Sequence, residues 1–304
     1  MNSPWTCIIS GFLSFAPKAY LDTRLQTTEK VELAFKITTD LRHLTVDILR
    51  NNPAILSALQ MSTCPPLARD RLINLASVSQ NLVKSLESGK LPVRMDGSIL
   101  EEQLNRIVQI IVRLLDPTIV DWLNDRKTSR DEARTRAASV IADRLCGSEA
   151  DPIIRNAQEQ RQLALLECWL RQRGYQKMDH QKFDSITEIP SGFFGIRYSV
   201  PVEMSSPKPV QIVVDLIVRP LKKQKNESLI LIEAKAAGDY TNVNKRRKEE
   251  AQKMNQLKRE YGAKVNYLLF LCGYFDAGYL GYEASEGIDW VWEHRIDDLA
   301  KIGL

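Results

Sequence analysis

The strongest constraint on the fold of this chain is an almost wholly apolar segment, Val265 to Cys272, near its C-terminus. An apolar run of this length, rich in branched and aromatic side chains, indicates a strand that is buried on both faces of a sheet. A long polar helix is expected immediately before it, from Asn244 to Tyr261. A strand that is reached through a helix pairs with a parallel neighbour. The chain therefore contains a sheet with a helical crossover.

Other segments complete this sheet. A helix is expected over Pro152 to Arg173, with Gly174 as its C-cap. Trp290 to His294 is expected to form a last strand that leads into a short C-terminal helix, with His294 in a structural role. Three segments rich in β-branched or aromatic residues have the composition of short strands: Phe194 to Val200, Val210 to Val218 and Ser228 to Ala234. The order predicts an α/β fold of the α+β type, a mixed β-sheet core flanked by helices.

The first part of the chain is expected to be helical. Apolar residues recur at three- and four-residue spacing over Glu101 to Leu115, which Asp116-Pro117 ends. Val31 to Leu49 repeats this pattern. The polar stretch 124–131 is expected to be a linker or exposed turn, followed by a helix that ends at Gly147-Ser148. We therefore expect a helical N-terminal region, residues 1–130, and a second domain, residues 131–304.

Composition narrows the class of protein. The chain has 304 residues, of which 44% are hydrophobic and 26% charged, so it is globular rather than disordered. Its net charge of +4 permits a polyanionic partner without requiring one. Five single cysteines and three scattered histidines argue against a zinc site. The N-terminus lacks the pattern of a signal peptide, and apolar runs fall short of the roughly 20 residues that a membrane span needs. A soluble, cytoplasmic protein without a membrane partner is expected.

Charged residues interrupt two of the expected strands. Asp215 lies within Val213 to Ile217, and Glu233 and Lys235 lie within Leu231 to Lys235. Charge in a buried strand is unfavourable unless it is paired or bound to a metal. Side chains alternate along a strand, so Glu233 and Lys235 emerge on one face. If the two strands are neighbours, two carboxylates and one ammonium group converge on a small patch.

Such a patch suits metal-assisted hydrolysis of a phosphodiester. Carboxylate oxygens are ligands that Mg²⁺ prefers, and the metal lowers the pKa of bound water. Lys235 would orient the attacking water and stabilise the developing negative charge. The competing interpretation is that these residues lie on the solvent face of an amphipathic sheet, because a Glu-x-Lys pattern alone is a weak signal. The apolar flanks and the order of elements favour the hydrolytic site.

Two further groups of residues are candidates. Glu159, on the helix before the sheet, could reach the metal directly or through water, although an ordinary exposed glutamate is the competing interpretation. A polar and basic segment after Lys235 could contact phosphates and base edges, through side chains and through the backbone N–H groups of a helix start. The alternative is a solvated helix face, because Glu249 and Glu250 follow. The DNA-binding candidates in it are Asn242, Asn244, Lys245, Arg246 and Arg247.

The pattern Asp215…Glu233-Ala234-Lys235, in this order of elements, resembles the PD-(D/E)XK nuclease superfamily, with Val214 in place of the proline of the motif. More narrowly, the chain is similar to type II restriction endonucleases of the XamI-like group. The features that carry this resemblance are the helical segment with Asp47-Ile48-Leu49 and Pro65-Pro66, the run Ala157 to Arg161, and the run Thr241 to Arg246.

This resemblance implies Mg²⁺-dependent cleavage of double-stranded DNA at a short palindromic site by a homodimer, within a restriction-modification system that includes a DNA methyltransferase. It implies that Asp215, Glu233 and the carbonyl of Ala234 ligate the metal. Residues 1–130 would embrace DNA or form the dimer, and residues 131–304 would be the catalytic domain. Two other interpretations stay open, a structure-selective repair or recombination nuclease and a DNA-binding protein without catalysis.

Overall fold

The computed structural model describes residues 4–123, 131–178, 183, 185–202, 210–221, 228–237 and 243–304, with side chains described in these ranges except at 4–14, 237, 243–250 and 263. The chain divides into two compact units, Gly11–Ile154 and Arg155–Leu304 with Met1–Ser10. The first half of helix α7 (Asp131–Gln172) packs in the helical unit, and its second half packs on the sheet. The domain boundary expected between residues 130 and 131 stays a prediction.

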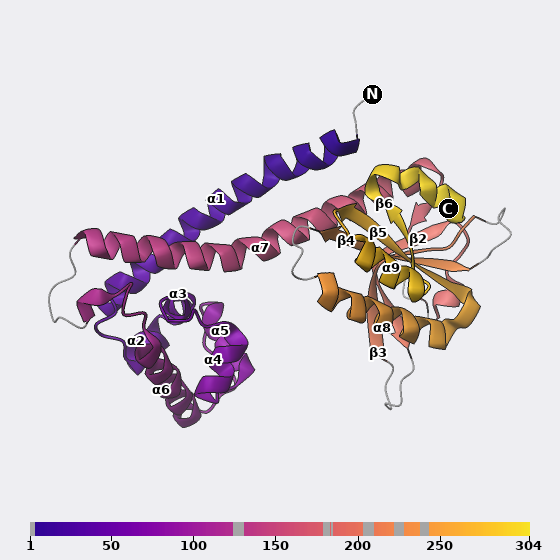
Figure 1. The fold of residues 1–304 in the computed structure, drawn as a ribbon. Coiled ribbons are helices and arrows are strands. Elements are labelled where there is room, and N and C mark those ends of the chain that lie inside the picture. Colours follow the sequence, from indigo (N-terminus) through magenta and orange to yellow (C-terminus); the bar gives the residue numbers. More distant parts are fainter. Residues whose placement is uncertain are drawn as a thin grey trace. The chain divides into compact units, whose positions relative to one another are not determined.

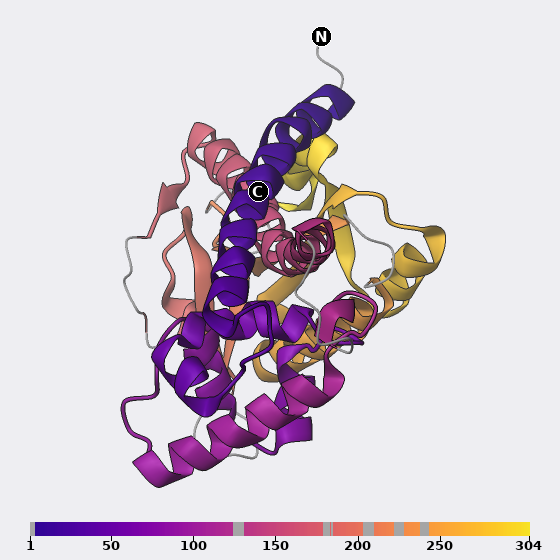
Figure 2. The same cartoon turned by 90° about the vertical axis from the view of Figure 1, so that its left-hand side faces the viewer.

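Helices form the first unit. Figures 1 and 2 both show α1 as one unbroken helix. The shorter helices pack their apolar residues into a single core. Among the described residues, no helix is both long enough and apolar enough to cross a membrane. The helices and short 3-10 turns before α7 are α1 (Pro4–Thr38), α2 (Val46–Asn51), η1 (Pro53–Ile55), α3 (Leu56–Met61), α4 (Arg69–Ala76), α5 (Gln80–Glu87), α6 (Gly97–Leu114) and η2 (Asp121–Leu123).

Two helix predictions in this unit need correction, and one is confirmed. The helix expected over Val31 to Leu49 is broken between α1 and α2, because residues 39–41 adopt left-handed backbone conformations with φ of 51°, 53° and 63°. Gly147-Ser148 does not end a helix. One glycine in a helix costs only about 1 kcal/mol, which the packing of the fully buried Cys146 and Ala150 offsets. The helix expected over Glu101 to Leu115 is confirmed as α6.

The second unit is built on one six-stranded mixed sheet whose strands lie in chain order, from β1 to β6. β3 runs antiparallel between β2 and β4, whereas β1 pairs parallel with β2, and β5 lies parallel between β4 and β6. The predicted helical crossover is confirmed, because α8 (Val243–Tyr261) joins the parallel strands β4 and β5. The strands are β1 (Gln176–Lys177), β2 (Phe193–Val202), β3 (Val210–Val218), β4 (Leu229–Ala237), β5 (Val265–Gly273) and β6 (Asp289–Trp292).

Helical elements cover both faces of the sheet. On one face, which we call the α7 face, Ile230 and Ile232 of β4 pack with residues of α7 and of the C-terminal 3-10 segment η6 (Glu293–Ile302). On the other face, the α8 face, Leu229 and Leu231 pack with residues of α8 and α9 (Ala277–Ser285). Figure 1 shows the ribbons of α8 and α9 beside the sheet. Helix α9 was not predicted, because its glycines obscured the helical pattern. Its N-cap is Asp276, whose carboxylate accepts a hydrogen bond from the Tyr279 N–H group.

Two neighbouring valines of β3 test this burial. Val214 is fully buried in the sheet core, whereas the side chain of Val213 is 51% exposed. Val214→Ala removes two buried carbon atoms and leaves a cavity, so we expect it to lower the free energy of unfolding by roughly 2 kcal/mol. Val213→Ala is the matched control and should change it by less than about 0.5 kcal/mol. Urea unfolding followed by tryptophan fluorescence measures both, and equal effects would contradict the described burial.

Candidate active site

The candidate site lies where strands β3 and β4 separate. Their pairing runs from Val218↔Ile230 to Leu216↔Ile232. Beyond that rung β3 continues its pairing with β2, and β4 continues with β5, through to the ends of those strands. The next residues along the diverging strands are Asp215 on β3 and Glu233 on β4. The two acids predicted from sequence therefore lie at the start of an opening in the sheet.

The side chain of Asp215 makes a hydrogen bond to the β4 backbone just beyond the point where the backbone pairing of β3 with β4 ends. Its Oδ2 atom accepts a hydrogen bond of 2.8 Å from the backbone N–H group of Ala234. Burial and the nearby charge of Glu233 raise the pKa of Asp215 from 3.8 to about 6, although the Ala234 hydrogen bond acts in the opposite direction. A buried carboxylate beside a second carboxylate favours a proton or a cation. The position thus has the electrostatics of a cation site.

Two lysines flank Glu233, whose side chain is only 11% exposed. Lys235 Nζ lies 3.3 Å from Oε1, and Lys253 Nζ, from α8, lies 2.6 Å from Oε2. Met254 and Leu257 bury the adjacent part of α8 against the sheet and so fix the helix that carries Lys253. The structure brings Asp215, Glu233 and Lys235 together as predicted, and it adds Lys253, which was not predicted.

Glu159 of α7 also belongs to this neighbourhood. Its negative charge contributes to the raised pKa of Asp215. Its Oε1 accepts a hydrogen bond of 2.7 Å from Nη2 of Arg197 on β2, and the two side chains are 32% and 49% exposed. Glu159 is therefore a partly exposed third acid beside the two strand carboxylates, held by an arginine that was not predicted.

The backbone at Arg197 is unusual for the interior of a strand. Its φ is 49°, in the left-handed region, where a residue other than glycine is less stable by roughly 1–2 kcal/mol. An exposed ion pair such as that with Glu159 contributes only about 0.2–1 kcal/mol. The ion pair therefore does not offset the backbone strain. Strained residues of this kind concentrate at functional sites.

Near Arg197 the side chains of both β2 and β3 change from one face of the sheet to the other. In β2, Ile196 packs on the α7 face and Tyr198 on the α8 face, although residues two apart normally share a face. The same reversal occurs in β3 between Val214 and Leu216. The register places Arg197 opposite Asp215, because Ile196 pairs with Leu216 and Tyr198 with Val214. One residue of each strand lies between these two rungs, so the reversal occurs without the extra residue that defines a β-bulge.

The residues fit a divalent cation with hard oxygen ligands. No group of three or more His, Cys, Asp or Glu side chains is placed to hold a metal within the described ranges. Mg²⁺ does not need such a group, because it keeps several waters and is bound by one or two carboxylates together with substrate phosphates. Asp215 and Glu233 supply two carboxylates, and the raised pKa of Asp215 shows that added positive charge would be favourable there.

The predicted DNA-binding residues are only partly described. Asn242 lies outside the described residues. Asn244, Lys245, Arg246 and Arg247 are in the first turns of α8, as predicted, but their side chains are not among those described. Their role in DNA binding stays a prediction.

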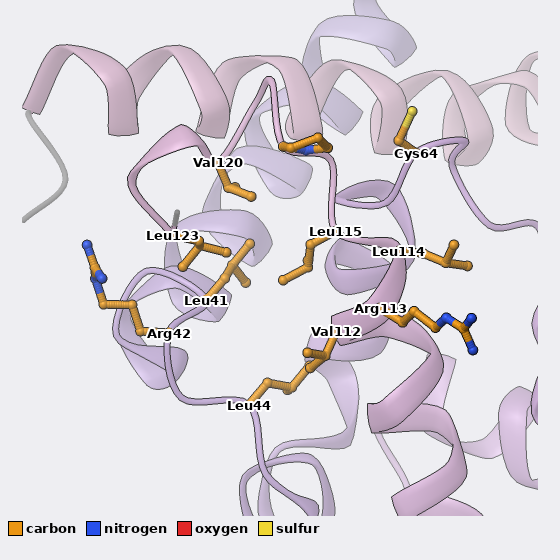
Figure 3. A pocket seen from close by; sticks show the side chains of 11 residues that line it. Leu41, Arg42, Leu44, Cys64, Val112, Arg113, Leu114, Leu115, Val120 and Leu123 are labelled. Carbon is orange, nitrogen blue, oxygen red and sulfur yellow. The ribbon is translucent and has the colours of Figure 1, made fainter. Parts of the chain in front are cut away.

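A pocket of about 750 Å³ lies in the helical unit, apart from the residues above (Figure 3). Its lining contains no acid, and Figure 3 shows Arg42 and Arg113 extending away from the leucine side chains. It therefore lacks the carboxylates that the residues at the strand separation provide. The lining residues are Leu41, Arg42, Leu44, Cys64, Val112, Arg113, Leu114, Leu115, Pro117, Val120 and Leu123.

Comparison with known proteins gives three findings. The model of the XamI restriction endonuclease family matches residues 39–292. The type II restriction enzyme SalI of Streptomyces albus G is 49% identical over 292 residues, which are 96% of this chain and 92% of that enzyme. The crystal structure of protein VC1899 from Vibrio cholerae aligns over 91% of this chain and 55% of its own, at 12% identity and a TM-score of 0.30, a likeness too low to carry an argument.

Asp215→Asn tests the electrostatics of the site without DNA. Because the folded-state pKa of Asp215 is raised from 3.8 to about 6, the folded chain binds more protons than the unfolded chain between these values. Stability therefore falls as the pH rises through this window and stays lower above it. Asparagine removes the charge and keeps an oxygen for the Ala234 N–H group. With a chelator present, we expect it to stabilise the protein by on the order of 2 kcal/mol near pH 8, and to have no such effect near pH 3.5. Thermal unfolding at both pH values measures this.

Asp116→Asn is the control of opposite sign. A hydrogen bond from the Thr118 hydroxyl group lowers the pKa of Asp116, which is 4% exposed. Its charge stabilises the folded state above the usual carboxyl pKa, so its loss should lower the unfolding temperature near pH 8. If both variants were destabilised near pH 8, Asp215 would not be the strained carboxyl described here.

Proposed function

Because the chain belongs to the XamI family of restriction endonucleases, and so is a hydrolase that cuts DNA at specific sites, we propose that Asp215, Glu233 and Lys235 form its catalytic centre with Mg²⁺. The observation that supports this proposal is the convergence of these three side chains where β3 and β4 separate. Ionisable groups inside a sheet are unfavourable unless they are paired or bind a cation.

In this proposal Asp215, Glu233 and the carbonyl oxygen of Ala234 hold the metal. The metal supplies an acidified water and charge stabilisation at the scissile phosphate. The hydrogen bond from the Ala234 N–H group fixes the orientation of the Asp215 carboxylate. Glu159 supports the site as a further acid, directly or through a water molecule.

The two lysines have separate tasks in this proposal. Lys253 holds the closer contact to Glu233, at 2.6 Å against 3.3 Å for Lys235. A close, charge-assisted hydrogen bond holds a buried carboxylate in one orientation. Lys253 is therefore a positioning residue for Glu233. Lys235 would orient the attacking water and stabilise the negative charge that develops in the transition state.

The assembly and the partners are part of the proposal. The substrate is double-stranded DNA with a short palindromic site, cut by a homodimer in which each subunit supplies one centre. The residues Asn242, Asn244, Lys245, Arg246 and Arg247 contact the DNA, and the helical region 1–130 embraces DNA or forms the dimer. A companion methyltransferase protects the host DNA, and both act in the cytoplasm.

Digestion of a long unmethylated plasmid tests the sequence specificity. With Mg²⁺ we expect discrete fragments whose ends share one palindromic sequence, because a restriction endonuclease discriminates by base contacts in the grooves. A smear of products, or a preference for branched DNA, would support a repair or recombination nuclease instead. Purified protein that binds DNA and never nicks it would support a non-catalytic binding protein.

Single variants test the catalytic centre. Asp215→Asn, Glu233→Gln and Lys235→Met should each lower the rate of cleavage by at least about 100-fold, because each removes a charge that acts in the transition state. They should retain DNA binding in Ca²⁺, measured by gel shift. Lys258→Met is the matched control. Lys258 lies on α8 like Lys253 but donates to the Gly287 carbonyl at 3.3 Å, and its loss should leave the rate unchanged. Normal cleavage by Lys235→Met would overturn the assignment.

A further inference from the structure

The residue opposite Asp215 on β2 has a feature that the proposed catalytic centre does not use. Arg197 adopts a left-handed backbone conformation at the rung where both strands reverse their faces. Glycine adopts this conformation without steric cost, and it would allow the same reversal. Aiming Asp215 therefore does not require a side chain at position 197, and certainly not a long cationic one.

The ion pair with Glu159 does not explain the arginine either. Both partners are substantially exposed, so solvent weakens their attraction. The pair contributes less to stability than the backbone conformation costs. A residue that is strained and poorly compensated in the folded state points to a role in binding or catalysis.

The position of the guanidinium group suggests what it binds. Nη2 is anchored by Glu159 at 2.7 Å, and Glu159 lies close enough to influence the pKa of Asp215, so Arg197 is beside the proposed centre. Its side chain is 49% exposed, which leaves it open to a ligand from solvent. A guanidinium group presents five N–H donors in a planar fork that matches the oxygens of a phosphate. The ligand class is therefore a phosphodiester group.

We propose that Arg197 binds a backbone phosphate of DNA beside the centre formed by Asp215 and Glu233, with Glu159 holding its guanidinium group in place. The proposal rests on the proposed function, which places the cut DNA at this centre. It assigns β2 a part in substrate binding. A phosphate contact carries no base information, so its loss should weaken binding to all sequences alike.

Arg197→Gly tests the proposal, because glycine keeps the backbone conformation and removes the cation. The protein should fold, with an unfolding temperature at or above that of the wild type. The probe is a short duplex of mixed sequence, with binding measured in a chelator over a series of salt concentrations. Each phosphate contact contributes about 0.9 to the slope of log affinity against log salt concentration. We expect the slope for Arg197→Gly to be shallower by about this amount.

Two further variants make the result specific. Arg197→Lys keeps the charge and should keep most of the wild-type slope. Arg171→Ala removes an arginine from a similar exposed ion pair, with Glu167 on α7, and should leave the slope unchanged. An Arg197→Gly slope equal to that of the wild type, or an equal change in Arg171→Ala, would overturn the proposal. Wild-type protein that neither binds nor cuts DNA would overturn the proposed function instead.

Discussion

Two acids, Asp215 and Glu233, lie close together inside a sheet. Their mutual repulsion is unfavourable, and neighbouring groups of the second unit offset it. Neighbouring carboxylates in a low dielectric medium repel each other and resist ionisation. One backbone N–H group donates a hydrogen bond to Asp215, and two ammonium groups donate hydrogen bonds to Glu233. The supporting groups come from β4 and α8, so the geometry of the centre depends on the packing of that helix on the sheet.

Much of this architecture could be predicted from the sequence, because it depends on local patterns. The apolar run of β5 and the helix before it fix a parallel pair, and the strands around Asp215 and Glu233 follow from their β-branched residues. The strand separation could not be predicted. It depends on where the pairing of β3 with β4 stops while β3 stays paired with β2 and β4 with β5, which is a property of four strands together.

Lys253 and Arg197 were missed for related reasons. Lys253 is 18 positions from Lys235 in the chain and meets Glu233 only through the crossover between β4 and β5. The apolar spacing of Met254 and Leu257 marks the buried face of α8, and Lys253 lies at the edge of that face, which was a usable signal. The sequence contained no such signal for Arg197, because no residue type or neighbouring pattern marks a left-handed conformation inside a strand. Helix α9 was missed because glycine is common in loops. Here the burial of Tyr279 outweighs the low helix propensity of the glycines.

The place of Lys253 on α8 has a mechanical consequence. The first turns of the same helix carry the basic residues 245–247, so if these bind DNA as proposed, a displacement of α8 by the DNA would also move the ammonium group at Glu233. A helix rises about 1.5 Å per residue, so a slide by a single residue would break a contact of 2.6 Å. In the proposed function, α8 would thereby couple DNA binding at its first turns to the alignment of the Glu233 carboxylate, which Lys253 contacts from the middle of the helix.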